Sequence, residues 1–319
     1  MPTAPADIIS GNFKGKDILS ISQFSQKDIE IVLKKAAQME KLVKERGGSD
    51  ILKGNIIAAL FYEPSSRTFG SFISAAQRLG AGIIPIQNMQ NSSAGKGETI
   101  EDTALVFESY ADVLIVRHPE VGSVGKMAEK ASVPVINAGD GIGEHPTQAL
   151  YDLYTIQSEL GNLDNLEVTF FGELAHYRPV NSLAMLLCLF PNIKINFVSP
   201  KIVALNPTVK EYLKKRNVNF VETENLDEVI KTTDVLYVTR VKKEFVPANI
   251  YKQIAGKYVV NKKTVSAMKS KSIILHALPR IDEISTEVDD DPRAVYLRSQ
   301  VKNGMYVRMA LLALVLGKI

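Results

Sequence analysis

Short runs of β-branched and aliphatic residues alternate with longer amphipathic segments along almost the whole chain. This alternation is typical of an α/β fold in which helices connect mainly parallel strands. A chain of 319 residues is longer than a single hydrophobic core usually accommodates. We therefore predict two doubly wound α/β domains with mainly parallel sheets, joined by interdomain helices. The expected strands span residues 56–61, 82–86, 113–116, 133–137, 168–171, 194–198, 235–238 and 272–276.

A helix over about residues 146–159 is expected to join the two sets of strands, and Gly161-Asn162 just beyond it suits a helix C-terminus. We place the boundary on this helix, with one domain over 1–150 and the other over 151–302. The last helix, within 303–319, has an apolar face too continuous to lie in water, so we expect it to pack back on the first domain. The remaining expected helices span 66–78, 99–110, 122–130, 180–189, 207–216 and 225–232.

Composition narrows the class of protein. The net charge of +3 is mild and no Lys/Arg run is long, which argues against a nucleic-acid partner. The most apolar stretch, 309–316, is much shorter than the roughly 20 residues of a membrane span, and the first fifteen residues do not resemble a signal peptide. The single cysteine, Cys188, cannot form an intrachain disulfide and is expected to be a buried small hydrophobe. We therefore expect a cytoplasmic protein.

The first expected strand runs into Glu63-Pro64-Ser65-Ser66-Arg67-Thr68, which opens a helix. Ser65 or Ser66 is a natural N-cap residue. Free backbone N–H groups, hydroxyls and an arginine therefore converge on a helix start, which is a ready anion site. A capped helix with an exposed arginine explains this segment equally well, so both interpretations stay open at this point.

Arginines follow expected strand ends in both halves of the chain. Arg117 follows the strand 113–116, although an arginine in such a place is by itself more often a surface residue. In the second half, Arg178, Arg240 and Arg280 lie beyond the ends of separate strands. Guanidinium groups pair with carboxylates in fork geometry, so arginines beyond two successive strand ends suggest a ligand with two carboxylates.

A glycine-rich loop follows the expected strand 133–137. Its three glycines, within 139–143, allow the backbone to approach a ligand closely. His145 and Gln148 are three residues apart at the start of the joining helix, so both can face one crevice. A lone histidine is usually structural, but this position favours a functional one.

Several common ligand sites are excluded by spacing. Gly95-Lys96 is not a phosphate-binding P-loop, because Gln90 stands where the first glycine is needed and Gly97 where Ser or Thr is needed. No Gly-x-Gly-x-x-Gly dinucleotide turn follows the strand 168–171. The four histidines include no pair at metal-ligand spacing. We therefore expect no cofactor and no metal.

Taken together, these stretches resemble the aspartate/ornithine carbamoyltransferase family, and in particular its aspartate branch. The likeness runs from about residue 15 to the end of the chain. Ornithine enzymes carry an Asp-x-Trp-x-Ser-Met-Gly element, whereas this chain has no tryptophan and its stretch 240–243 is cationic. The resembling segments, in family order, are Phe61 to Phe72 with its Ser-x-Arg-Thr core, Ser92 to Thr99, Arg117-His118-Pro119, Asn137 to Gln148, Thr239-Arg240-Val241 and His276 to Arg280.

The resemblance implies transfer of the carbamoyl group of carbamoyl phosphate to L-aspartate, giving N-carbamoyl-L-aspartate for pyrimidine synthesis. Thr68, Arg117 and His145 would stabilise charge developing on the carbamoyl oxygen, and Gln148 would hold the carbamoyl NH₂. With Arg67, these four residues form the implied catalytic set. The implied carbamoyl phosphate-binding residues are Ser65, Ser66, Arg67, Thr68, Ser93, Arg117, His145, Gln148, Leu278 and Pro279.

For aspartate, the resemblance implies that Arg178 and Arg240 bind the two carboxylates, with Lys242 as a further cation. It also implies a homotrimer with shared sites, in which Ser93 and Lys96 come from a neighbouring chain. No side chain stands out as a strong general base. The resemblance implies that the amine of aspartate attacks deprotonated and that the departing phosphate accepts its remaining proton. A separate regulatory chain is left open as a further partner.

The sequence departs from the family pattern at three positions. Lys242 stands where glutamine is usual, Ala277 replaces a proline and Phe69 replaces an arginine. These changes bear on affinity and domain closure rather than on reaction type. Two alternatives stay open: a carbamoyltransferase with another amine acceptor, such as ornithine or an acyl-ornithine, and a non-catalytic anion-binding relative.

Overall fold

A computed structural model of the chain describes residues 7–141, 143–241, 243, 246–254 and 256–319. The chain divides into two compact units, Met1–Tyr151 with Lys302–Ile319, and Asp152–Val301. Each unit contains one parallel sheet with helices packed on it, which confirms the predicted α/β class. Helices α5 (Pro146–Leu160) and α10 (Ser299–Val315) each begin in one unit and end in the other.

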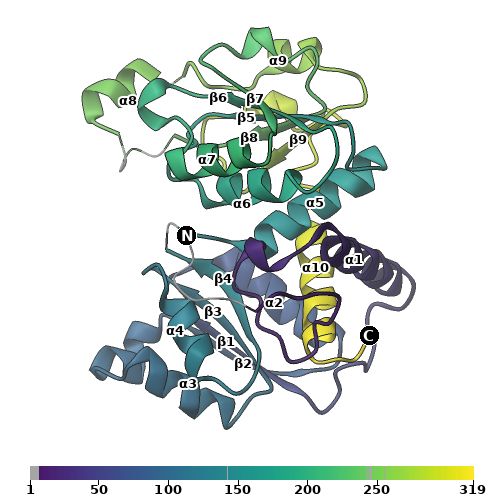
Figure 1. The fold of residues 1–319 in the computed structure, drawn as a ribbon, viewed down its shortest axis with the longest axis vertical. Coiled ribbons are helices and arrows are strands. Elements are labelled where there is room, and N and C mark those ends of the chain that lie inside the picture. Colours follow the sequence, from purple (N-terminus) through teal and green to yellow (C-terminus); the bar gives the residue numbers. More distant parts are fainter. Residues whose placement is uncertain (1–6, 142, 242, 244–245, 255) are drawn as a thin grey trace. The chain divides into compact units, whose positions relative to one another are not determined.

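The first unit is built on a four-stranded sheet with the strand order β2-β1-β3-β4 (Figure 1). Helices α3 and α4 cover one face, over a buried cluster that includes Leu60, Leu114 and Met127. Helices α2 and α10 lie on the other face, where Ser74 Oγ on α2 is 3.1 Å from the sulfur of Met305 on α10. The elements are α1 (Gln26–Arg46), β1 (Ile56–Phe61), α2 (Ser66–Arg78), β2 (Gly82–Gln87), α3 (Ile100–Glu108), β3 (Val113–His118), α4 (Ser123–Lys130) and β4 (Val135–Asp140).

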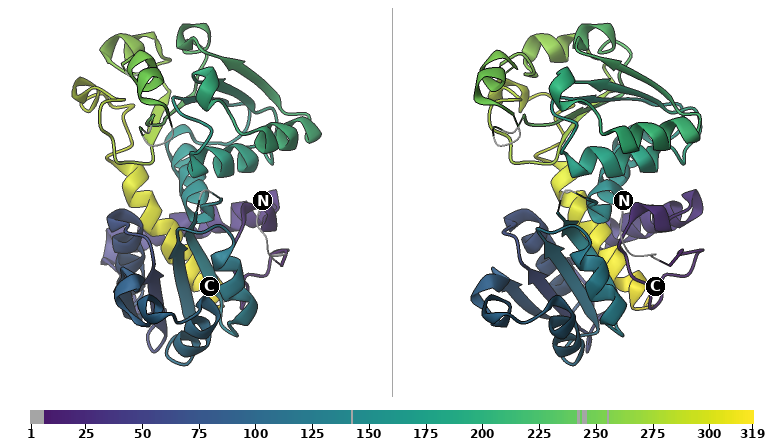
Figure 2. Two further views of the ribbon diagram at one scale, coloured as in Figure 1. Left: turned by 90° about the vertical axis from the view of Figure 1, so that its left-hand side faces the viewer. Right: turned by 60° about the vertical axis from the view of Figure 1, so that its left-hand side comes forward.

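The second unit is built on a five-stranded parallel sheet with the order β7-β6-β5-β8-β9 (Figure 1). Figure 2 gives two further views of the ribbon. One face carries a buried cluster that includes Val238 of β8, Val265 of α9 and Tyr296. The other face is covered by α6 and α7 (Figure 1). The elements are β5 (Glu167–Phe171), α6 (Arg178–Leu187), β6 (Lys194–Val198), α7 (Pro207–Lys215), β7 (Asn219–Thr223), β8 (Val235–Val238), α8 (Ala248–Ile254), α9 (Lys262–Ala267) and β9 (Ile273–His276).

Local sequence signals explain several boundaries. Ser25 and Asp28 form a capping box at the start of α1, and Gly47 ends that helix in the left-handed conformation, with φ of 75°. The Thr99 side chain accepts the backbone N–H of Asp102 at the start of α3. Strand β3 is buried from Val113 to Arg117 because helices cover both faces of the sheet, so it reads as a continuous apolar run rather than an alternating one.

The helix predicted over 225–232 is wrong. The structure has only a short 3-10 turn there, Leu226–Glu228, opened by the Asn225 side chain, which accepts the N–H of Asp227. Thr232 and Thr233 then turn their hydroxyls to backbone and side-chain acceptors just before β8 begins. Short polar and β-branched residues compete with helical hydrogen bonding in this way.

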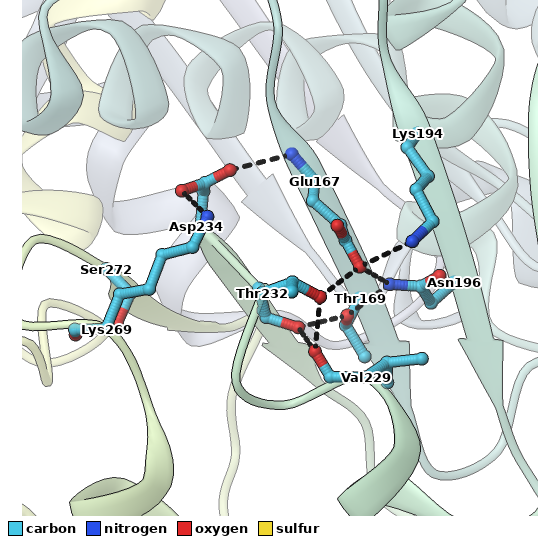
Figure 3. Close-up of polar contacts among 10 residues, drawn as sticks. Glu167, Thr169, Lys194, Asn196, Val229, Thr232, Asp234, Lys269 and Ser272 are labelled. Carbon is cyan, nitrogen blue, oxygen red and sulfur yellow. Dashed lines mark hydrogen bonds and ion pairs between the residues drawn. The ribbon is translucent and has the colours of Figure 1, made fainter.

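A polar network closes the amino edge of the second sheet (Figure 3). The Glu167 carboxylate at the start of β5 accepts from Lys194, Asn196 and Thr232 at 2.7–3.1 Å. Asp234, just before β8, accepts the backbone N–H of Glu167 and the ammonium of Lys269. Burial would raise the pKa of Glu167, but its hydrogen bonds, the one from Asn196 foremost, outweigh it and the pKa is lowered. The charged side chains of this network thus form hydrogen bonds and ion pairs within the second unit.

Candidate active site

The strand order of the first sheet creates one switch point, between β1 and β3. The chain moves from β1 outward to β2 and then crosses back to β3 on the other side of β1. In open α/β sheets, ligands bind beyond the carboxyl ends of the strands at such a point. The segment from Glu63 to Thr68 follows β1, and Arg117 is paired with Phe61 at the end of β3. Two of the predicted anion-binding elements therefore meet at this edge.

Helix α2 begins here with an open N-terminus. Ser65 is the N-cap residue, in the extended conformation, but its side chain makes no capping hydrogen bond. Ser66 and Arg67 are exposed, whereas Thr68 is buried. A helix N-terminus with uncapped N–H groups favours an anion. The sequence left open whether this was only a capped helix, and the missing side-chain cap favours the anion site.

Arg117 is a buried cation, with 8% of its surface exposed. Its Nη2 donates to the Glu63 carboxylate at 2.9 Å, and its Nη1 donates to the backbone oxygen of Ala138 at 3.3 Å. The next residue, His118, accepts the N–H of Glu120 on Nδ1, and burial lowers the pKa of its imidazole. Arg117 is therefore held in the site rather than on the surface, while a neutral His118 shapes the turn.

The start of the loop after β4 is hydrogen-bonded to the chain segment that follows β3. Both carboxylate oxygens of Asp140 accept the N–H of Gly122, at 2.9 and 3.0 Å, and Gly141 donates to the backbone oxygen of His118. At Gly141, with φ of 52°, a Cβ would lie 2.8 Å from the backbone oxygen of Pro119. This glycine is therefore required by the neighbouring chain segment, a reason that the sequence did not suggest.

His145 and Gln148 are both buried: His145 directly precedes α5 and Gln148 lies in its first turn. The preceding residue, Glu144, is anchored to the N-terminal segment: its two oxygens accept the Ser20 hydroxyl and the Ile21 N–H, each at 2.7 Å. Burial raises the pKa of the Glu144 carboxyl. The position of His145 thus depends on a segment more than 120 residues away along the chain.

Ser93 and Lys96 lie on a short exposed 3-10 helix, Ser93–Lys96, between β2 and α3. Ser92 starts this turn by accepting the N–H of Ala94, and Gly97 ends it with φ of 98°. Among the contacts of the described residues, none joins Ser93 or Lys96 to Arg67, Arg117 or His145. Within the described part of one chain, Ser93 and Lys96 thus make no direct polar contact with these three residues.

The second sheet has its own switch point, between β5 and β8. Gly172, directly after β5, has φ of 117°, and a Cβ there would lie 2.3 Å from the backbone oxygen of Thr239. The Thr239 hydroxyl donates to the backbone oxygens of Phe171 and Glu173, at 3.1 and 2.8 Å. The segments that lead to Arg178 and Arg240 are thereby held against each other.

Arg178 is the first residue of α6, and Arg240 follows β8 by two residues; both are half-buried. The turn before Arg178 is built on the buried Glu173, whose carboxylate accepts the N–H of His176 at 2.8 Å and contacts its Nδ1 at 3.0 Å. Two guanidinium groups at one switch point match a ligand with two carboxylates. Lys242 lies outside the described residues.

Leu278 and Pro279 follow β9 at the same carboxyl edge of the second sheet. Their peptide bond is cis, and Leu278 has a positive φ of 56°. The Leu278 side chain packs against the core cluster below, while Pro279 is exposed. Of the predicted residues, the carboxyl edge of the first sheet thus carries Ser65 to Thr68, Arg117, His145 and Gln148, and that of the second carries Arg178, Arg240, Leu278 and Pro279.

The acidic partners of this arrangement are not evident from the sequence. Glu63, Glu144 and Glu173 each stand next to a predicted site segment, but no local sequence pattern assigns them a role. Within the described residues, no group of three or more His, Cys, Asp or Glu side chains could hold a metal ion. Over the same residues, no helix is both long and apolar enough to cross a membrane.

Comparisons with known proteins agree with this geometry. Residues 16–158 match the model of the aspartate/ornithine carbamoyltransferase carbamoyl-P binding domain, and residues 164–315 match that of the Asp/Orn binding domain. The chain is 48% identical to the chloroplastic aspartate carbamoyltransferase of Arabidopsis thaliana over 95% of its own length and 78% of that protein.

Solved structures agree as well. Aspartate transcarbamoylase from Trypanosoma cruzi in complex with carbamoyl phosphate matches with a TM-score of 0.90 and 39% identity, over 95% of this chain and 97% of that one. The catalytic subunit of M. Jannaschii aspartate transcarbamoylase matches with a TM-score of 0.88 and 42% identity, over 93% and 96%. With both of its sheets ending in cationic switch points and both family domains matched in order, this chain belongs to the aspartate/ornithine carbamoyltransferase family.

Proposed function

We propose that this chain transfers the carbamoyl group of carbamoyl phosphate to the amino group of L-aspartate, giving N-carbamoyl-L-aspartate and phosphate. The observation that carries the proposal is that each sheet has positively charged groups beside the switch point in its strand order. One combines a helix N-terminus with a buried arginine and suits a phosphate, and the other carries two arginines and suits a dicarboxylate. Relatives named aspartate carbamoyltransferase, at 44–48% identity, support aspartate as the acceptor. We propose pyrimidine synthesis as the setting of this reaction.

The first unit would bind carbamoyl phosphate. Its phosphate carries roughly −1.5 to −2 charges near neutral pH, and the α2 N-terminus with Ser65, Ser66, Arg67 and Thr68 supplies N–H, hydroxyl and guanidinium donors. Arg117 and His145 would face the carbamoyl oxygen, and Gln148 would hold the carbamoyl NH₂. All three side chains are buried, and a donor in a water-poor site stabilises developing charge more than one in bulk water.

The second unit would hold aspartate by its two carboxylates, through Arg178 and Arg240, with Lys242 as a further cation. Leu278 and Pro279 would contact the carbamoyl group and the amine. The amine nitrogen attacks the carbamoyl carbon, the bond from that carbon to the phosphate oxygen breaks, and the departing phosphate accepts the amine proton. Catalysis would then depend on proximity and preorganised charge rather than on a protein base.

We also propose that the site is shared between copies of this chain in a homotrimer, with Ser93 and Lys96 completing a neighbour's site. Their exposure on a short turn supports the proposal. Dilution until the oligomer dissociates should then lower the activity per chain. Light scattering would monitor the dissociation. If the activity per chain stays constant while the oligomer dissociates, the sites are not shared.

The direct test of the function is a colorimetric assay for the ureido product, with carbamoyl phosphate and either L-aspartate or L-ornithine. Product with L-aspartate alone is the expected outcome. If product forms with L-ornithine or an acyl-ornithine instead of L-aspartate, the chain uses a different amine acceptor. Absence of product with every acceptor, from folded protein, would favour a non-catalytic anion-binding relative.

A further inference from the structure

The turn that carries Leu278 is closed by a buried histidine. His276, the last residue of β9, is 2% exposed. The backbone N–H of Leu278 donates to Nδ1 of the His276 ring at 2.7 Å. The other ring nitrogen, Nε2, lies 2.7 Å from Oε1 of Glu283, which is itself buried. Both nitrogens of this imidazole are therefore engaged by the turn that it supports.

These contacts fix the tautomer of His276. A backbone N–H can only donate, so Nδ1 must accept and carries no proton. Nε2 then carries the proton and donates it to the Glu283 carboxylate. Burial raises the pKa of Glu283, but its hydrogen bonds, the one from His276 foremost, outweigh burial and leave the pKa lowered. A charged Glu283 thus holds His276 in the form that can accept from Leu278.

Glu283 and His276 also tie down the rest of the turn. The second carboxylate oxygen of Glu283 accepts the N–H groups of Ile281 and Asp282, each at 3.1 Å. The backbone N–H of His276 donates to the Gln300 side chain at 3.0 Å, and Gln300 donates in turn to Asp152 at 2.7 Å. The turn is therefore anchored at both ends within the second unit.

Leu278 needs such support because of its backbone. Its φ of 56° lies in the left-handed region, which a leucine adopts only when its surroundings hold it there. Two contacts hold it: its side chain packs against the core cluster, and its N–H is bound by His276. Together they set the direction in which the Leu278 carbonyl points.

We propose that His276 and Glu283 are positioning residues of the carbamoyl transfer, which fix the Leu278 backbone for contact with the carbamoyl group and the incoming amine. This inference rests on the proposed function. Neither side chain would touch substrate; Glu283 acts on His276, and His276 acts on Leu278. A purely structural histidine in the core would contribute to stability without selecting the direction of the Leu278 carbonyl.

Two substitutions of His276 separate these roles. In His276→Asn, the amide oxygen can occupy the place of Nδ1 and still accept from Leu278, but the donor to Glu283 is lost. In His276→Gln, the longer side chain places its amide near Nε2 and can still donate to Glu283, but the acceptor for Leu278 is lost. Each variant therefore keeps one contact of the ring and removes the other.

The proposal predicts a crossover between activity and stability. His276→Asn should unfold at a lower temperature than His276→Gln, because it leaves the buried Glu283 oxygen without its donor. Nevertheless, His276→Asn should keep kcat within about threefold of wild type, while His276→Gln should lose at least about tenfold through a displaced contact. The KM for L-aspartate should change less than about twofold in both variants, because the carboxylates are held by Arg178 and Arg240.

The measurements are the ureido assay over both substrates and thermal unfolding by circular dichroism. Equal losses of kcat in the two variants, or a greater loss in the less stable one, would overturn the proposal. Carbamoyl phosphate affinity, measured by calorimetry without an acceptor, should rank the variants in the same order. The two proposals can fail separately. If the wild-type chain is inactive with L-aspartate, the proposed function is refuted. The order of carbamoyl phosphate affinities in the two variants still tests whether His276 and Glu283 position Leu278.

Discussion

The guanidinium of Arg117 donates to the carboxylate of Glu63 at 2.9 Å, so the cation proposed to meet the carbamoyl oxygen already has an internal counter-charge. Arg117 is almost fully buried, whereas the Glu63 side chain is one-third exposed. The buried Nε of Arg117 has no hydrogen-bond partner among the described residues. In the proposed site the substrate oxygen would share the Arg117 guanidinium with Glu63, so we expect this pair to influence affinity.

Replacing Arg117 by methionine removes the positive charge but keeps much of the buried side-chain volume. We expect kcat to fall by about 10²–10³, the range for loss of one donor to a developing oxyanion. Carbamoyl phosphate affinity should also fall, because the positive charge of Arg117 no longer offsets the negative charge of the Glu63 carboxylate beside the incoming dianion. Steady-state kinetics and calorimetry measure the two effects separately.

The double variant Arg117→Met, Glu63→Gln tests the second effect. Removing the negative charge of Glu63 should bring carbamoyl phosphate affinity part of the way back, although kcat stays low because the donor is still missing. Glu63→Gln alone is the matched control. If the double variant binds carbamoyl phosphate no better than Arg117→Met, the Glu63 charge does not act on the substrate.

Arg67 and Arg240 should divide the substrates between them. Arg67→Ala removes an exposed guanidinium at the α2 N-terminus, so carbamoyl phosphate binding and turnover should both collapse while stability stays within about 0.5 kcal/mol. Arg240→Ala should raise the KM for L-aspartate at least about tenfold and leave carbamoyl phosphate binding nearly intact. Equal loss of carbamoyl phosphate binding in both variants would show that the division is wrong.

Gly172 should tolerate no side chain. In Gly172→Ala, the Cβ would collide with the backbone oxygen of Thr239 in addition to adopting a left-handed φ. We expect a loss of more than about 2 kcal/mol of stability, within the range for strained backbone positions, and weaker binding of aspartate. Gly161→Ala is the control: its φ of 87° is also left-handed, but nothing lies within 4 Å of the added Cβ, so it should cost only about 1 kcal/mol. Similar losses in both variants would exclude the collision as the cause.

Asp17 gives the protein a pH-dependent stability term. Burial raises the pKa of its carboxyl to about 6, although the carboxylate accepts the N–H of Val135 at 2.8 Å. The folded state therefore holds a proton that the unfolded state releases near pH 4. This contribution is fully present below about pH 4 and is lost as the pH rises through 6, by roughly 3 kcal/mol at most.

Asp17→Asn should remove that dependence and keep an acceptor for Val135. The variant should match wild type near pH 4 and exceed it in unfolding temperature near pH 7. Circular dichroism follows this well, because the chain contains no tryptophan for fluorescence. Wild-type and variant curves that stay parallel from pH 4 to 7 would show that Asp17 does not carry the term.

The sequence by itself determined the α/β class and the positions of most strands in the two sheets. The strands at Ile56–Phe61, Lys194–Val198 and Val235–Val238 and the helix at Ser66–Arg78 have the predicted bounds, because buried parallel strands and amphipathic helices leave strong local patterns. No predicted element covered the edge strand Asn219–Thr223, whose side chains are mostly exposed and show no apolar run. The cationic segments also stood out, since each follows a strand end in the sequence.

Only the tertiary structure decided which strands are neighbours and hence which loops share an edge. The order β2-β1-β3-β4 brings Glu63 to Arg117 across 54 residues, and the fold of the N-terminal segment brings Ser20 to Glu144 across 124. The contacts of His276 with Leu278 and Glu283 depend on a turn whose geometry cannot be predicted from sequence periodicity. Periodicity reports which face of one element is buried, whereas these pairings arise only when separate elements pack together, so the partners of the predicted site residues could be seen only in the folded chain.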